Sequence, residues 1–146
     1  MTVMEDFPEK VQSIIGPLLS SLGFRLDEID DDVDEGGRRG SVVYYRSSDC
    51  KLQVYWSARE YEINAMIAPL DAPNEHGLYN RSRKWHYLNE FIKAPDLPLE
   101  ELVQVLKAER SNFESETKWL EWLRGRIKEY FPVARDSVLR SEQGRQ

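Results

Sequence analysis

Residues 41–67 hold three runs of strand-forming side chains that are separated only by short turns. The runs are rich in β-branched and aromatic residues, and in the last run (61–67) apolar side chains recur at every second position. The turns at 47–49 and 59–60 are too short for the crossover connection that parallel strands need. The sequence therefore predicts that consecutive strands in this region are antiparallel neighbours.

Amphipathic segments lie on both sides of this predicted ribbon. Apolar side chains in residues 7–22 follow helical spacing, but Pro17 interrupts them at a cost of roughly 3 kcal/mol in a helix interior. The helix must kink or restart near Gly16, and we favour one kinked helix because the apolar stripe continues in phase. A helix is also predicted to begin after Pro98, and a longer helix then follows and ends at Pro132.

The remaining segments complete an α+β prediction for a single domain. Residues 24–29 form a first strand that leads into an acidic connection, 69–84 form a long loop, and 85–92 form either a short edge strand turning into a helix or a short helix alone. We expect an N-terminal helix, a four-stranded antiparallel meander and C-terminal helices packed on the sheet, all within residues 1–133. A polar tail (134–146) follows. The second sheet face is covered by the last helix or left for a partner.

Charge and composition restrict the classes of function. The chain has 146 residues and a net charge of -6, with a pI near 5.0. A negative chain is poorly suited to nucleic acid or to anionic membranes, but it suits a basic protein partner. The N-terminal residues lack an apolar signal core, and no run of apolar residues is long enough to span a membrane. We expect a cytoplasmic protein that binds neither nucleic acid nor membrane.

The segment DEIDDDVDEGGRRG (27–40) places seven acidic residues within nine positions. A calcium loop needs a glycine at its sixth position and a bidentate acid at its twelfth, and neither register starting at Asp30 or Asp31 supplies both. We predict no metal site. The segment is then either a solvated hairpin connection or a negative surface for a basic partner. The partner-binding candidates in it are Asp31, Asp32, Asp34 and Glu35.

Catalytic chemistry has few candidate side chains in this sequence. The thiol of Cys50 and the imidazoles of His76 and His86 could form a Cys–His pair, but nothing near Cys50 in the sequence would lower its pKa. Two histidines without cysteine partners make a poor zinc site, and no nucleophile elbow, phosphate loop or dinucleotide motif is present. We expect a protein that is not an enzyme and has no cofactor. The alternative is a small hydrolase that uses His76 or His86.

The long loop mixes the residue types that dominate protein–protein interfaces. Its partner-binding candidates are Tyr79, Arg81, Arg83 and Trp85. Core packing is the other interpretation of its tryptophan. This loop has too few cationic side chains to bind nucleic acid, given the overall negative charge of the chain.

Four short features extend over roughly residues 7–92. They are the Leu-Gly-Phe that ends the first helix (22–24), the Ser-Ser-Asp turn (47–49), the Arg-Glu hairpin tip (59–60) and the Trp-His-Tyr-Leu segment (85–88). In this pattern the chain resembles small uncharacterised bacterial proteins, several of which look like immunity proteins from polymorphic-toxin loci. The resemblance implies a non-enzymatic binder that neutralises a toxin. A further alternative is a structural homodimer that buries an exposed sheet face on itself.

Overall fold

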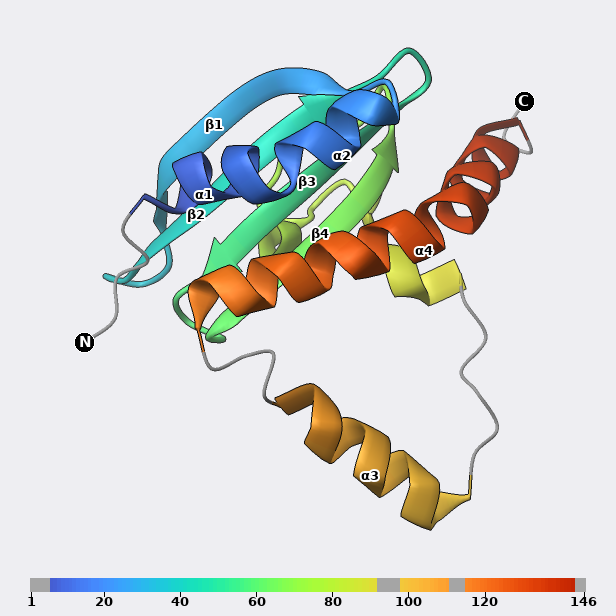
Figure 1. Ribbon diagram of the computed structural model, residues 1–146. Coiled ribbons are helices and arrows are strands. Elements are labelled where there is room, and N and C mark those ends of the chain that lie inside the picture. Colours follow the sequence, from blue (N-terminus) through green and yellow to red (C-terminus); the bar gives the residue numbers. More distant parts are fainter. Residues whose placement is uncertain (1–5, 92–97, 111–114, 144–146) are drawn as a thin grey trace.

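The computed structural model describes residues 6–91, 98–110 and 115–143 (Figure 1). Five strands form one antiparallel sheet in the order β1-β2-β3-β4-β5, and helices cover one of its faces. The α+β prediction is confirmed, with one strand more than the four expected. The elements are α1 (Phe7–Ile14), α2 (Gly16–Ser21), β1 (Arg25–Asp34), β2 (Arg39–Arg46), β3 (Cys50–Ser57), β4 (Glu62–Pro69), η1 (Gly77–Tyr79), β5 (His86–Tyr87), η2 (Leu88–Phe91), α3 (Leu99–Arg110) and α4 (Glu116–Gln143).

The helix-covered face of the sheet holds the larger core. Side chains of α1, α2 and α4 pack there against β2, β3 and β4, and Figure 1 shows the helices crossing the same side of the sheet. The Nζ atom of Lys10 lies 2.9 Å from the Oε2 atom of Glu116, which joins α1 to the start of α4. The buried residues of α4 recur at helical spacing: Leu120, Leu123, Ile127, Phe131, Ala134 and Val138.

The opposite face of the sheet is covered by the long connection between β4 and β5. Trp85 and Ala72 pack there against Tyr44, Tyr55 and their neighbours in a second buried cluster. The Nζ atom of Lys51 donates a hydrogen bond to the carbonyl of Ala72, and this bond helps to hold the loop on the sheet. The loop therefore occupies the face that we expected to be covered by the last helix or left for a partner.

Helix boundaries differ from the prediction at two prolines. At Pro17 the chain restarts as α2 instead of continuing as one kinked helix, and Ile15 separates the two short helices. The predicted helix end at Pro132 is wrong, because α4 continues to Gln143. Pro132 is exposed, and the helix continues because Ala134 and Val138 are buried beyond it, which offsets the lost backbone hydrogen bond. Within 134–143 the predicted polar tail is helix that adds to the core.

Of the two structures expected for residues 85–92, the protein has the short edge strand that turns into a helix. β5 pairs with β4 through His86 and Tyr87 and turns directly into the 3-10 helix η2. The helix predicted after Pro98 is confirmed as α3, which Figure 1 shows standing apart from the sheet. Within the described ranges, no helix combines the length and the apolar character needed to cross a bilayer.

The acidic segment is a strand and not the loop that the sequence predicts. β1 runs to Asp34 and pairs with β2 to the level of Arg39, so only residues 35–38 connect the two strands. An edge strand has one side without a neighbouring strand, and its charged side chains remain in solvent. The repulsion among these carboxylates is consequently compatible with extended backbone.

Candidate functional site

The exposed strand at the edge of the sheet carries most of the acidic residues singled out by the sequence. β1 is at the margin of the sheet, and eight of its ten residues are exposed. Arg39 on β2 donates to Asp31 at 2.9 Å. We call the six carboxylates of β1 the acidic edge: Asp27, Glu28, Asp30, Asp31, Asp32 and Asp34.

Two irregularities in the pairing of β1 with β2 decide where its side chains point. The register shifts between Leu26 and Glu28 and again between Asp30 and Val33. Leu26 and Ile29 are three positions apart, and in a regular strand they would lie on opposite faces. With the first shift they pair with Tyr45 and Val43, which both face the helices. Leu26 and Ile29 therefore share the helix side of the strand, where they are 45% and 40% exposed.

Glu28 and Asp30, the acids on either side of Ile29, point to the other side of the strand. Glu28 pairs with Tyr44 and Asp30 pairs with Val42, and both partners belong to the loop-covered cluster. The charges of the two acids help to raise the pKa of the Tyr44 hydroxyl, although burial is the larger cause. Between its two register shifts, β1 thus presents the apolar Ile29 on one face and the carboxylates of Glu28 and Asp30 on the other.

Glu35 lies in the interior, unlike the other acids of the segment. It is 5% exposed, and its carboxylate accepts hydrogen bonds from Ser57 Oγ at 2.7 Å, Ala58 N at 2.8 Å and Tyr79 Oη at 3.0 Å. Gly40 makes room for it, since a Cβ at residue 40 would lie 2.5 Å from Glu35 Oε1. A buried carboxylate with three donors holds the fold together. Its side chain is not available to the partner that we predicted for it.

The loop candidates divide between interior and surface. Trp85 is 2% exposed, and its indole N–H donates to the carbonyl of Pro73 at 2.8 Å, so it is a core residue and not an accessible anchor. Arg81 and Arg83 are on the surface, and Tyr79 is half-buried through its bond to Glu35. The structure brings Tyr79 to the hairpin that follows the acidic edge.

One loop residue connects the acidic edge to the long connection. The amide nitrogen of Asn74 donates to Glu28 Oε1 at 2.7 Å and to Asp27 Oδ2 at 3.1 Å. The acidic edge and the loop therefore form one continuous surface. Sequence reasoning missed Asn74. It also missed the apolar pair Leu26 and Ile29, because two residues three positions apart share a face of a strand only when a bulge lies between them.

The two histidines of the hydrolase alternative have different surroundings. His76 is 5% exposed, lies against the rings of Tyr55 and Tyr79, and places Nε2 3.0 Å from the carbonyl oxygen of Trp56. Burial lowers the pKa of His76, while the Trp56 carbonyl and the nearby Glu35 partly oppose this effect. His86 is at the surface, with Nδ1 2.7 Å from Glu90 Oε2. His76 is built into the packing of the loop on the sheet.

We expect the free energy of unfolding to fall as the pH drops below the ordinary histidine value of 6.5. Below this pH the imidazole of residue 76 is protonated in the unfolded chain but stays neutral in the folded protein, where burial lowers its pKa. Acid therefore favours unfolding. This group changes the free energy of unfolding by at most about 1.4 kcal/mol per pH unit. Urea unfolding between about pH 7.5 and pH 5 measures the slope. His76→Gln should reduce the slope, and the surface variant His86→Gln is the control. Equal slopes in wild type and His76→Gln would contradict this assignment.

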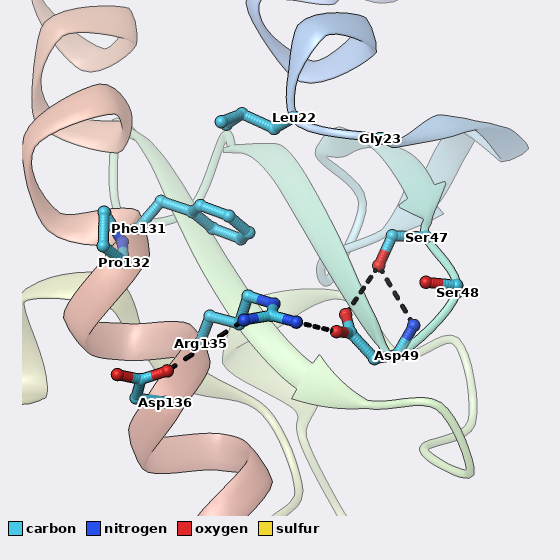
Figure 2. A pocket seen from close by; sticks show the side chains of 9 residues that line it. All are labelled: Leu22, Gly23, Ser47, Ser48, Asp49, Phe131, Pro132, Arg135 and Asp136. Atoms are coloured by element: carbon cyan, nitrogen blue, oxygen red, sulfur yellow. Dashed lines mark hydrogen bonds and ion pairs between the residues drawn. The ribbon is translucent and has the colours of Figure 1, made fainter.

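A pocket of about 410 Å³ lies where the β2–β3 turn meets α4 (Figure 2). Asp49 from the turn accepts a hydrogen bond from Arg135 of α4, and Asp136 lies 4.0 Å from the other end of the same guanidinium. The Arg135 contact lowers the pKa of the Asp49 carboxyl. Phe131 and Leu22 supply apolar walls. These contacts tie α4 to the turn, and the carboxylates neutralise the cation within the pocket.

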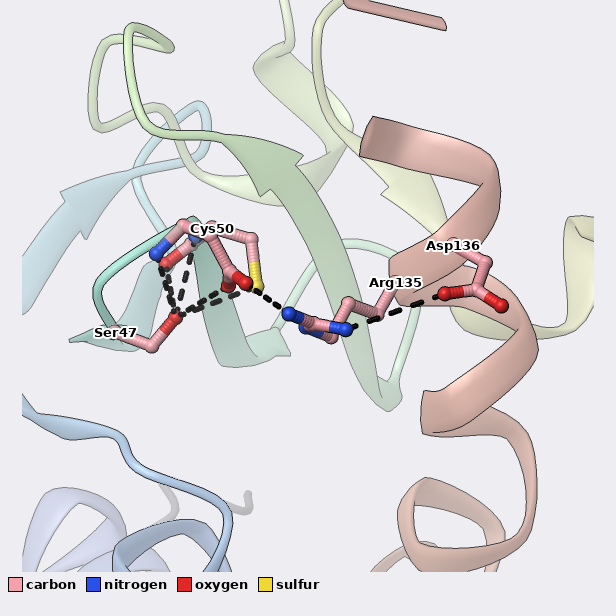
Figure 3. Close-up of polar contacts among 5 residues, drawn as sticks. Ser47, Cys50, Arg135 and Asp136 are labelled. Atoms are coloured by element: carbon pink, nitrogen blue, oxygen red, sulfur yellow. Dashed lines mark hydrogen bonds and ion pairs between the residues drawn. The ribbon is translucent and has the colours of Figure 1, made fainter. Parts of the chain in front are cut away.

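Cys50 follows the pocket residues Ser47, Ser48 and Asp49 in the chain, and Figure 3 shows its contacts with Ser47. Its Sγ atom is 3.5 Å from Ser47 Oγ, and the same hydroxyl accepts the backbone N–H of Cys50 at 3.2 Å. The thiol is fully buried, and burial raises its pKa to about 11. At neutral pH the sulfur is consequently a protonated thiol, which is a weak nucleophile.

We expect Cys50 to react slowly with a thiol reagent in the folded protein. With the pKa about two units above the ordinary value of 9.0, the thiolate fraction falls about 100-fold, and burial slows access further. Rates of alkylation by iodoacetamide with and without denaturant test this. Similar rates in the two conditions would show that the thiol is accessible and ionised in the folded state.

Metal binding has no cluster of ligands to support it in the described part of the chain. Among residues 6–91, 98–110 and 115–143, no group of three or more histidine, cysteine, aspartate and glutamate side chains is placed to hold a metal ion. In the acidic edge an extended backbone sends neighbouring carboxylates to different sides, instead of wrapping them around one point.

No protein-family model, no curated protein and no solved structure matches the chain.

Proposed function

We propose that the protein is a non-enzymatic binding module that takes a basic protein partner on the acidic edge. One observation carries the proposal: six carboxylates lie on a ten-residue exposed strand whose only cation is Arg25. Such a concentration of one charge attracts a partner of the opposite charge and speeds its association. The surroundings of Cys50 and His76 also support a binding role over catalysis, since both side chains are buried in packed parts of the fold.

The most specific form of the proposal is neutralisation of a basic toxin. The sequence resemblance to immunity proteins suggests it, and a negative surface is suited to covering a positively charged site on a toxin. The proposed surface is the acidic edge, and the exposed Arg81 and Arg83 of the long loop are further candidates, while Glu35 and Trp85 are buried and support the fold.

The test combines a partner assay with matched charge variants. The product of the adjacent gene is purified, and its binding is measured by calorimetry and its toxicity by co-expression. The variant Asp30→Asn/Asp31→Asn/Asp32→Asn removes three charges from the acidic edge, and Glu121→Gln/Glu129→Gln/Asp136→Asn removes three exposed charges from α4. We expect the first variant to bind about tenfold more weakly at low salt, mainly through slower association, and the second to bind like the wild type.

Two results would count against the proposal. If both variants bind like the wild type, the acidic edge is not the binding surface. If the adjacent gene encodes no toxin and a pull-down at physiological salt recovers no basic protein, the toxin-neutralising form of the proposal is lost.

A further inference from the structure

The sheet ends at β1 with one side of its backbone open. Within the described residues, β1 pairs along one side only, with β2, and Figure 1 shows it at the outer margin of the sheet. The opposite margin is different, because β5 is two residues long and leads straight into η2. An exposed edge of this length is a template for another extended chain, which gains backbone hydrogen bonds by adding to it.

We propose that the acidic edge binds its partner by strand addition, in which an extended basic segment pairs with β1 as a sixth strand. This inference rests on the proposed function and deepens it. The register of β1 is regular over residues 28–30, between its two shifts, so pairing is centred on Ile29. The bulges re-aim the side chains of β1 and confine the added strand to a short stretch.

The two faces of β1 set the pattern of the added segment. Side chains opposite Glu28 and Asp30 point to the loop side, where a lysine or arginine meets a carboxylate. The side chain opposite Ile29 points to the helix side, where an apolar residue covers Ile29 and extends the contact toward Leu26. The expected segment therefore alternates basic and apolar residues.

The same charges exclude a second copy of this chain as the occupant. If β1 of one molecule paired with β1 of another, acidic side chains would lie opposite acidic side chains, and like charges directly across a strand pair are destabilising. Charge complementarity thus selects a basic segment of a different protein.

The experiment uses a lysine–valine alternating heptapeptide as the probe. The comparison peptide carries Nα-methyl groups on its fourth residue and on its fifth, one of which is a lysine and the other a valine. Adjacent residues direct their N–H groups to opposite sides of a strand, so this pair of methyl groups blocks pairing along both sides and preserves every charge. Binding to the full protein is followed by fluorescence anisotropy, and amide exchange of residues 28–30 is followed by NMR.

We expect the unmethylated peptide to bind, to protect amides of β1 from exchange, and to bind at least about tenfold more tightly than the methylated peptide. Glu28→Lys/Asp30→Lys should weaken binding of the unmethylated peptide by a similar factor, and so should Ile29→Ser, which removes the apolar contact without adding a charge. The control Glu121→Lys/Glu129→Lys makes the same charge change on exposed sites of α4 and should leave binding unchanged. Circular dichroism confirms that each variant is folded.

The possible failures are distinguishable. If the two peptides bind equally and the β1 charge reversal weakens both, attraction of a basic partner stands and strand addition is overturned. If neither peptide binds the folded wild type at low salt, strand addition is overturned as well. The proposed function is then tested separately, by the binding of the adjacent gene product to the Asp→Asn variant of β1 and to its α4 control. Equal effects of the β1 and α4 reversals would overturn the assignment to β1.

Discussion

Replacing Trp85 by alanine is expected to lower the free energy of unfolding by about 3–5 kcal/mol, the range found when large aromatic side chains are truncated in cores. Trp85 is 2% exposed, packs 6.0 Å from the ring of Tyr44 and ties the loop to itself through the carbonyl of Pro73. Its removal opens a large cavity and leaves that carbonyl without its donor. Chemical denaturation followed by circular dichroism measures the change.

The matched control is Trp119→Ala, because Trp119 is only partly buried at the margin of the core. We expect a smaller loss of stability for this variant, since less of its surface is removed from water. An interface role for Trp85 would give the reverse result. A Trp85→Ala protein that keeps wild-type stability and loses partner binding would show that the indole leaves the core to act as an anchor.

Glu35→Ala is expected to destabilise the fold by about 2–4 kcal/mol, because three hydrogen-bond donors lose a charged acceptor. The backbone N–H of Ala58 has the least freedom to find another partner, whereas the hydroxyls of Ser57 and Tyr79 can turn. The substitution removes contacts between three regions of the chain, since Glu35 follows β1, Ser57 ends β3 and Tyr79 ends η1. Urea denaturation at neutral pH provides the measurement.

Glu60→Ala is the control for Glu35, because its side chain is 55% exposed in the neighbouring turn. A change within about 0.5 kcal/mol is expected there, as for most surface substitutions. Similar small effects at both positions would mean that water replaces the carboxylate of Glu35 without cost. The buried network would then contribute nothing to holding the loop on the sheet.

The contrast between Glu35 and its neighbours shows where sequence reasoning reaches its limit. The seven acids of the segment are equivalent by residue type, and the sequence places all of them on one solvated surface. Gly40 leaves space for the side chain of Glu35, and Ser57 at the end of β3 donates a hydrogen bond to its carboxylate. Both residues lie outside the run of acidic residues, 27–35. No local pattern around residue 35 reports the donors that surround it.

Trp85 illustrates the same limit for aromatic residues. Trp, Tyr and Arg in one loop are typical of an interface, and a tryptophan in a core has the same local sequence signal. The outcome depends on whether the loop folds back onto the sheet. Lys51 and Gln53 of β3 hold it there through hydrogen bonds to the carbonyls of Ala72 and Glu75, and Asn80 donates to the carbonyl of Trp85 within the loop.

Local sequence was sufficient to predict the antiparallel sheet and the helix after Pro98, because apolar periodicity and short turns act over a few residues. It also placed the carboxylates of β1 on the surface. Only tertiary structure decided that the acidic segment is an edge strand, that bulges bring Leu26 and Ile29 to one face, and that α4 continues past Pro132. Each of these depends on contacts between residues far apart in the chain, and such contacts outweigh the local preferences of proline and of clustered charge.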